Sequence, residues 1–116
     1  MVSSLAFWAA GIGFAIGSAD VKDSEKPMKA TTVYYSGNVQ GVGFRMTAVM
    51  IARDYPVTGW VKNLADGRVQ LLVEGPEDQV ARFLKAIRER WKGDIEKEET
   101  EDQKPTGKFK KFEIMH

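Results

Sequence analysis

The stretch Val57–Glu74 reads Val-Thr-Gly-Trp-Val-Lys-Asn-Leu-Ala-Asp-Gly-Arg-Val-Gln-Leu-Leu-Val-Glu. Its two halves, Val57–Asn63 and Arg68–Glu74, are rich in β-branched and apolar residues, which suit a pleated and half-buried surface. Between them, Leu64–Gly67 ends in an Asp-Gly pair, which tolerates the positive φ angles of a tight hairpin turn. This stretch therefore predicts two antiparallel strands that are joined by a short turn.

One strand and one helix are predicted before this hairpin. Ala30–Ser36 contains consecutive β-branched and aromatic residues, and Gly37 ends the predicted strand. From Phe44 to Tyr55, apolar residues recur at the spacing of one helix face. We expect this helix to stop before Pro56, because a residue that precedes proline is disfavoured in the helical conformation.

A second helix and two extended segments are predicted after the hairpin. The helix begins near Pro76, whose fixed φ suits a first turn, and its apolar face runs to Trp91. Asp94–Thr100 is rich in charged residues, with Ile95 facing inward, as is typical of an edge strand. After a turn at Lys104–Gly107, the apolar residues of Phe109–Ile114 predict a last extended piece.

The predicted order is β-α-β-β-α-β with an added terminal strand. This is the ferredoxin-like α+β arrangement, a sandwich in which two helices cover one face of an antiparallel sheet. The chain of 116 residues has the length of one domain. We expect Trp60 and Trp91 to lie in its core.

The composition limits the chemistry that the chain can perform. There are 17 basic and 16 acidic residues, so the net charge of +1 gives no overall field that would attract a nucleic acid or an acidic membrane. The chain has no cysteine, and its one histidine is the terminal His116, so thiolate and histidine acid–base chemistry are not expected. An RNA-recognition module shares the predicted topology, but Arg68–Glu74 lacks the aromatic residues that such a module stacks on bases. No nucleic acid partner is predicted.

Residues 1–27 have a different composition from the rest. Met1–Ala19 has no ionisable side chain, and its apolar run Leu5–Ile16 is shorter than the roughly 20 residues that span a bilayer. One interpretation is a signal peptide or anchor, with small residues before Asp20 as a cleavage site. The other is that translation starts at Met28. The domain would be residues 28–116 in both cases, exported or membrane-anchored in the first and cytoplasmic in the second.

The loop Gly37–Arg45 (Gly-Asn-Val-Gln-Gly-Val-Gly-Phe-Arg) is the first candidate site. Three glycines allow the backbone to curl and to direct successive N–H groups toward an anion, and the following helix adds partial positive charge. Arg45, in the first helical turn, is placed to donate two hydrogen bonds to a phosphate or carboxylate. The alternative is a tight turn with a surface arginine.

Asn63, at the end of the predicted second strand, is the second candidate. Its amide can both donate and accept hydrogen bonds, so it can orient a water molecule without taking its proton. The alternative is that Asn63 caps the adjacent hairpin, in which Asp66 is a turn residue.

Two motifs in this order resemble the acylphosphatase family. Gly37–Arg45 is similar to the family's G-x-V-Q-G-V-x-F-R signature, and Gly59–Val69 is similar to its partner G-W-V-x-N-x-x-D-G-x-V. The resemblance runs from Met28 to Ile114, with Gln70 standing where a glutamate is common. It implies that Arg45 and Asn63 are catalytic, Arg45 holding the phosphate and Asn63 positioning the attacking water. The phosphate-binding residues that it implies are Asn38, which replaces a common arginine, and Val39, Gln40, Gly41, Val42, Gly43, Phe44 and Arg45.

The implied reaction is hydrolysis of an acyl phosphate to a carboxylate and inorganic phosphate, by a monomer that uses no metal and no cofactor. The scarcity of acid–base groups agrees with this reaction. The leaving group is a carboxylate, whose conjugate acid has a pKa of about 4, so it departs without a proton. Phosphoryl transfer depends mainly on positioning and electrostatic stabilisation. A phosphate-binding or other anion-binding module without turnover is the alternative.

Overall fold

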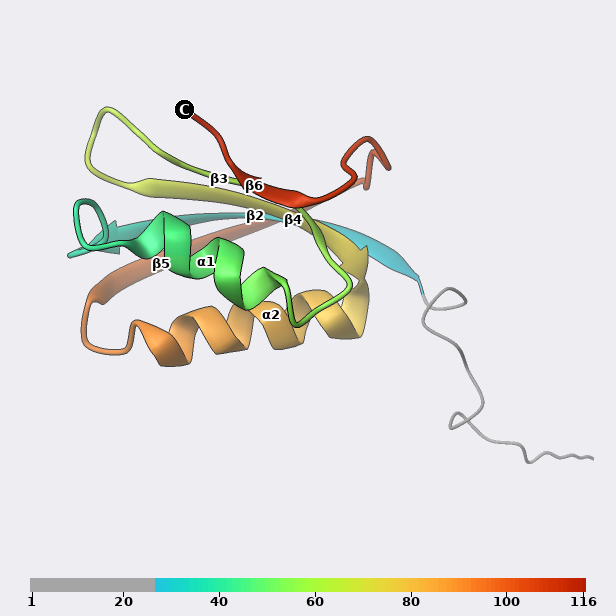
Figure 1. The fold of residues 1–116 in the computed structure, drawn as a ribbon, viewed down its shortest axis with the longest axis horizontal. Coiled ribbons are helices and arrows are strands. Elements are labelled where there is room, and N and C mark those ends of the chain that lie inside the picture. Colours follow the sequence, from blue (N-terminus) through green and yellow to red (C-terminus); the bar gives the residue numbers. More distant parts are fainter. Residues whose placement is uncertain (1–26) are drawn as a thin grey trace, which may run out of the picture.

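The computed structural model describes residues 27–116, so the expectations for residues 1–26 lie outside the described part. The strands and helices form a two-layer α+β sandwich (Figure 1). No helix within the described residues is long and apolar enough to cross a membrane. The elements are β2 (Met28–Gly37), α1 (Phe44–Ala52), β3 (Thr58–Asn63), β4 (Val69–Pro76), α2 (Glu77–Arg90), β5 (Ile95–Gln103) and β6 (Phe112–Ile114).

The sheet has five strands in the order β5-β2-β4-β3-β6. The pairs β2–β4, β2–β5 and β3–β4 are antiparallel, and the predicted hairpin is the β3–β4 pair. The α+β ferredoxin-like fold is therefore as predicted. The sheet is mixed rather than wholly antiparallel, because β6 pairs parallel to β3, with Gly59 opposite Phe112 and Val61 opposite Ile114.

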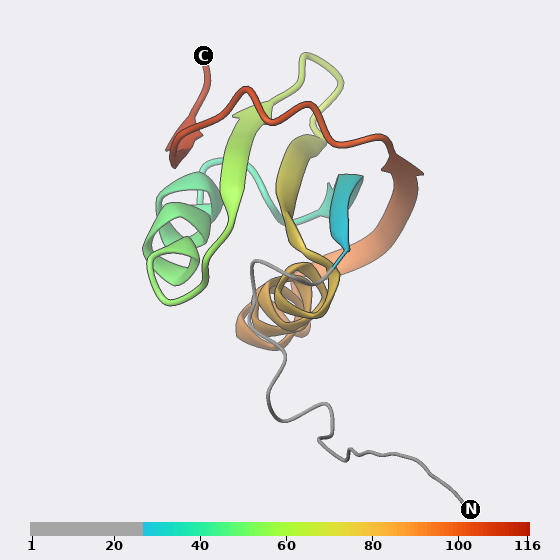
Figure 2. The same cartoon turned by 90° about the vertical axis from the view of Figure 1, so that its right-hand side faces the viewer.

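Both helices cover the same face of the sheet, as Figure 2 shows. Side chains of β2 and β4 on this face, such as Val33 and Leu71, are fully buried against helix residues such as Phe83. Aromatic rings extend this core, and the rings of Phe83 and Phe112 meet edge to face with their centres 5.3 Å apart. Burial of this apolar face is the main force that holds the helices on the sheet.

The opposite face of the sheet is crossed by the connection between β5 and β6, which passes over the strands in Figure 2. Glu74 of β4 is only 2% exposed, and its carboxylate accepts hydrogen bonds from Thr106 and Gly107. The Thr106 hydroxyl adds a third bond, at 2.9 Å. The carboxylate therefore fixes the connection over the sheet, although the sequence gives no sign of this role.

Some predicted boundaries differ from the structure. Helix α1 ends at Ala52 instead of Tyr55. After Ala52 the backbone N–H groups donate to the carbonyl three residues earlier, as in a 3₁₀-helix, rather than four residues earlier. Strand β5 continues to Gln103, three residues beyond the prediction, since it pairs with β2. The last strand contains only Phe112–Ile114, so Phe109 is not part of it. Trp91 is buried as predicted, whereas Trp60 lies on the other face of β3 and is only half buried.

Candidate active site

The loop between β2 and α1 carries the first predicted motif, and both of its ends are fixed. Phe44, the first residue of α1, is 1% exposed, and its ring centre lies 5.0 Å from that of Tyr35 and 5.2 Å from that of Trp91. At the other end, the Asn38 N–H donates to the Asp94 carbonyl at 2.9 Å. The Asn38 side chain also donates to the Asp94 carboxylate, at 3.1 Å. The intervening glycines can therefore hold an unusual backbone path without support from their own side chains.

Seven successive backbone amides in this loop and the first turn of α1 are available to a ligand. Gly41 and Gly43 have φ angles of 77° and 86°, in the left-handed region that favours glycine. The N–H groups of residues 40–46 have no hydrogen-bond acceptor among residues 27–116, although the N–H of Val39 donates to Gly37 and that of Thr47 to Gly43. Gly43 caps α1 without a side-chain hydrogen bond, and the first turn has no acidic residue. The loop and helix end thus form a cradle suited to an anion.

A pocket of about 190 Å³ opens at this cradle. Gly41 and Gly43 form part of its wall, and Arg45 and Asn63 line it from α1 and from the end of β3. Its size suits a phosphate group with a water molecule better than a large ligand. The remaining lining residues are Val39, Phe44, Met46 and Ile114.

The two predicted catalytic side chains have unused hydrogen-bonding capacity. Arg45 is partly exposed and forms no ion pair with any residue of the described chain. The Oδ1 atom of Asn63 is buried and has no hydrogen-bond partner among the described residues. This oxygen is therefore available to accept a hydrogen bond from a ligand or a water molecule. Asn63 therefore does not use this oxygen to cap the hairpin.

Gln40 connects the two motifs. Its side-chain Nε2 donates to the carbonyl oxygens of Leu64 and Arg68, both at 2.8 Å. These carbonyls belong to the turn that directly follows Asn63. Gln40 therefore positions the cradle relative to Asn63, a role that no spacing rule predicts.

The structure places the predicted phosphate-binding residues in two groups. Five of them line the pocket, with Val39 and Phe44 contributing buried side chains at its base. The other three do not line it: the Asn38 side chain contacts Asp94, that of Gln40 contacts the hairpin, and Val42 is 39% exposed. Only backbone groups of Gln40 and Val42 are therefore available to an anion here. Met46 and Ile114 line the pocket but were not predicted, because their apolar side chains carry no chemical signal.

The Asp66 carboxylate, in the hairpin turn that follows Asn63, is hydrogen-bonded to Arg68. Asp66 accepts from the backbone N–H of Arg68 at 3.1 Å and from its Nε at 2.9 Å. The backbone hydrogen bond is the main reason that the pKa of Asp66 lies below its ordinary value. Asp66 is thus engaged within the turn, as predicted, and does not line the pocket. Among residues 27–116, Arg45 is the only ionisable residue that lines this pocket.

The site thus combines a cradle of backbone amides with one arginine in a ferredoxin-like fold. The family model for acylphosphatase matches residues 31–114. The chain is 41% identical over 91 residues to the acylphosphatase of Bacillus licheniformis, a match that covers 72% of this chain and 94% of that protein. It therefore belongs to the acylphosphatase family, enzymes that hydrolyse acyl phosphates.

Other comparisons agree with this assignment. A match of 54% identity over 52 residues to the acylphosphatase of Bacillus velezensis spans 45% of this chain and 58% of that relative. The crystal structure of acylphosphatase from Bacillus subtilis superposes with a TM-score of 0.69 at 32% identity, over 76% of this chain and 99% of that one. Full-length HypF, in a phosphate- and nucleotide-bound form, has a TM-score of 0.68 at 26% identity. That match covers 78% of this chain and 12% of HypF.

Proposed function

We propose that the 37–45 loop and Arg45 hold the phosphate of an acyl phosphate, and that Asn63 orients the attacking water, without a metal ion. The observation that carries this proposal is the shared pocket, in which the unpaired amides, the Arg45 guanidinium and the unpaired Asn63 oxygen meet. Each of these groups suits a different part of the reaction.

The amides and Arg45 stabilise charge on the phosphoryl group. In phosphoryl transfer, negative charge is spread over the three equatorial oxygens, and fixed donors stabilise it without reorganising. Arg45 supplies a planar fork of N–H donors, which fits two oxygens of one phosphate. The carboxylate then leaves unprotonated, so no general acid is required.

Asn63 acts on the nucleophile. A water molecule that donates one hydrogen to the buried Oδ1 atom has its lone pair directed by that bond. The neutral amide does not remove a proton, so Asn63 works through orientation rather than as a base, and the protons of the attacking water leave with the inorganic phosphate product. Proximity and alignment of this kind account for a large part of the barrier reduction in enzymes.

Steady-state hydrolysis of benzoyl phosphate in excess EDTA tests the proposal. The wild-type protein should be active, and Arg45→Ala and Asn63→Ala should each lower kcat by at least about 100-fold, the order of loss seen when one transition-state donor is removed. Arg82→Ala, on the outer surface of α2, and Lys62→Ala, next to Asn63 on β3, are the matched controls and should retain activity. Full activity in both site variants would falsify the assigned roles, and loss of activity in EDTA would contradict the metal-free mechanism.

Binding of inorganic phosphate separates the two roles. Phosphate should raise the melting temperature of the wild-type protein, because a ligand that binds only the folded state stabilises it. The shift should disappear in Arg45→Ala and persist in Asn63→Ala. Phosphate binding without any hydrolysis by the wild-type protein would instead support an anion-binding module.

A further inference from the structure

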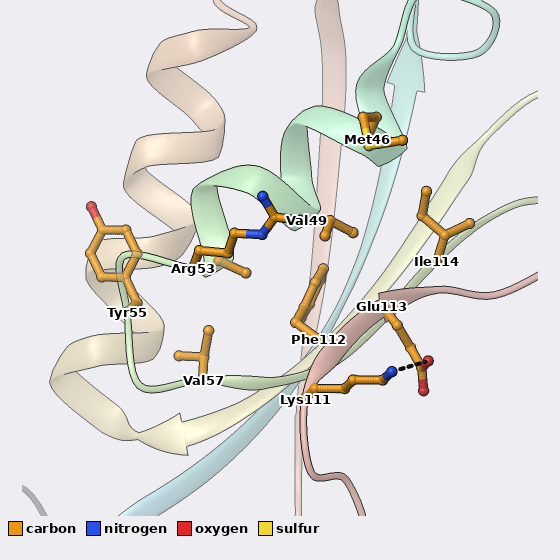
Figure 3. A pocket seen from close by; sticks show the side chains of 10 residues that line it. Met46, Val49, Arg53, Tyr55, Val57, Lys111, Phe112, Glu113 and Ile114 are labelled. Atoms are coloured by element: carbon orange, nitrogen blue, oxygen red, sulfur yellow. Dashed lines mark ion pairs between the residues drawn. The ribbon is translucent and has the colours of Figure 1, made fainter.

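A second hollow of about 530 Å³ lies between α1 and β6, beside the phosphate pocket. The two share Met46 and Ile114 as lining residues, so they adjoin each other. In Figure 3, Met46 and Ile114 lie at one end of this hollow, and Tyr55 and Val57 lie at the other. We call it the acyl groove, and it contains Met46, Val49, Ala52, Tyr55, Phe112 and Ile114 among its lining residues.

The floor of the acyl groove is apolar and its rim is charged. Ala52, Val57 and Phe112 are each less than 9% exposed, and Val49 faces Phe112 across the groove (Figure 3). Of the charged lining residues, Arg53 is exposed, and Lys111 is 3.8 Å from Glu113 in an exposed ion pair. A ligand in the groove would therefore contact hydrocarbon below and water above.

We propose that the acyl groove binds the acyl group of the substrate, and that the enzyme prefers acyl phosphates with an apolar chain of medium length. This inference rests on the proposed function, because it takes the adjoining 190 Å³ pocket as the phosphate site. A phosphate held there has its acyl carbon at the boundary formed by Met46 and Ile114. The chain then has a continuous apolar surface to follow.

The dimensions of the groove set the length of the chain. Arg45 and Ala52 are seven residues apart on α1, which corresponds to about 10 Å along the helix axis. With bonds of about 1.5 Å, an eight-carbon chain spans roughly the same distance. Met46 is 56% exposed at the entrance, and its flexible thioether can adapt to acyl groups of different shape.

The kcat/KM values of the full chain for acetyl, butyryl and octanoyl phosphate test this inference. Burial of one methylene contributes a factor of about four at most, so even a half-open groove should favour octanoyl over acetyl phosphate by at least about tenfold. Values that agree within twofold across the series would overturn the acyl groove and leave the proposed function standing. Failure to hydrolyse any of the three would overturn the proposed function and the groove with it.

A pair of variants on α1 locates the preference. Val49→Glu places a charge on the groove wall and should bring the octanoyl-to-acetyl ratio of kcat/KM close to one. Met50→Glu makes a similar change at the next residue, which is 56% exposed and does not line the groove, and should keep the wild-type ratio. Any unfolded fraction lowers both rates equally, so the ratio does not depend on how much of a variant folds. An unchanged ratio in Val49→Glu contradicts the proposal.

Discussion

The side-chain nitrogen of Gln40 lies 2.8 Å from the carbonyl oxygen of Leu64, which ties the anion cradle to the residue that directly follows Asn63. The same nitrogen donates to Arg68 across the turn. The two groups that act on one phosphate in the proposed mechanism thus belong to segments far apart in the sequence, and the Gln40 amide connects them.

Replacing Gln40 by methionine removes this connection at nearly constant volume. We expect kcat to fall by roughly 100-fold, the effect of a misplacement of about 1 Å, while KM changes little. Loss of two hydrogen bonds should also lower the free energy of unfolding by about 1–3 kcal/mol. Gln70→Met is the control, because Gln70 donates to the Tyr34 hydroxyl at 3.2 Å and does not line the phosphate pocket. Equal kcat values for the two variants would show that Gln40 is only structural.

The kcat for hydrolysis of benzoyl phosphate should depend little on pH between about 5 and 8. Histidine is the side chain whose ordinary pKa lies in this range, and none lines the phosphate pocket, where Arg45 is the only ionisable residue. Measurements of kcat for benzoyl phosphate in buffers of constant ionic strength check this expectation. A bell-shaped profile would reveal an acid and a base that the proposed mechanism does not contain.

Glu74 and Thr106 provide a test of what holds β6 in place. Glu74→Ala should lower the free energy of unfolding by about 2–3 kcal/mol, because it removes the charged acceptor of the Thr106 and Gly107 N–H groups. Thr106→Ala keeps both backbone bonds and should cost about 1 kcal/mol. Urea denaturation compares the two variants. Similar losses would mean that the hydroxyl, rather than the backbone bonds, carries the interaction.

The buried hydroxyl of Tyr35 should lower the stability of the folded protein at alkaline pH. Its side chain is fully buried, and burial, with a smaller contribution from Glu98, raises the pKa of its hydroxyl well above the ordinary value of about 10. A raised pKa in the folded state stabilises the fold below pH 10, and this contribution is lost as the pH rises further, because the unfolded chain ionises first. Tyr35→Phe should therefore unfold at a higher pH than the wild-type protein.

The same variant should not lose stability near neutral pH. The Tyr35 hydroxyl has no hydrogen-bond partner in the described residues, so its removal leaves no other group unpaired. Thermal unfolding at pH 7 and pH 10.5 measures both effects. A large loss at pH 7, or an unchanged alkaline limit, would contradict this account.

The fold was predictable because local patterns and tertiary packing agree over most of the chain. The Asp66-Gly67 turn defines the β3–β4 hairpin, and the apolar face of α2 is the one that packs on the sheet. The parallel pairing of β6 was not predictable, because periodicity shows which residues face inward but not the direction of a neighbouring strand. Its direction follows from the connection that Glu74 fixes over the sheet.

The candidate site was predictable to the extent that its chemistry lies in short motifs. Residue type and position made Arg45 and Asn63 candidates with a structural alternative for each, the resemblance to the acylphosphatase motifs singled them out, and both line one pocket. The bond from Gln40 to the hairpin and the contribution of Ile114 depend on contacts between distant segments. Such contacts leave no spacing signal in a single sequence.

The unpaired amides of residues 40–46 also determine which experiments can detect them. Side-chain replacement at Gln40 or Val42 leaves every N–H in place, so an alanine scan would miss these donors unless it disturbed the path of the loop. Semisynthesis that replaces single peptide bonds by esters would remove them one at a time. Loss of anion binding through the backbone is accordingly expected to follow replacement of Gly41 or Gly43, which shape the loop, whereas an exposed side chain such as Val42 can change without loss of a backbone donor.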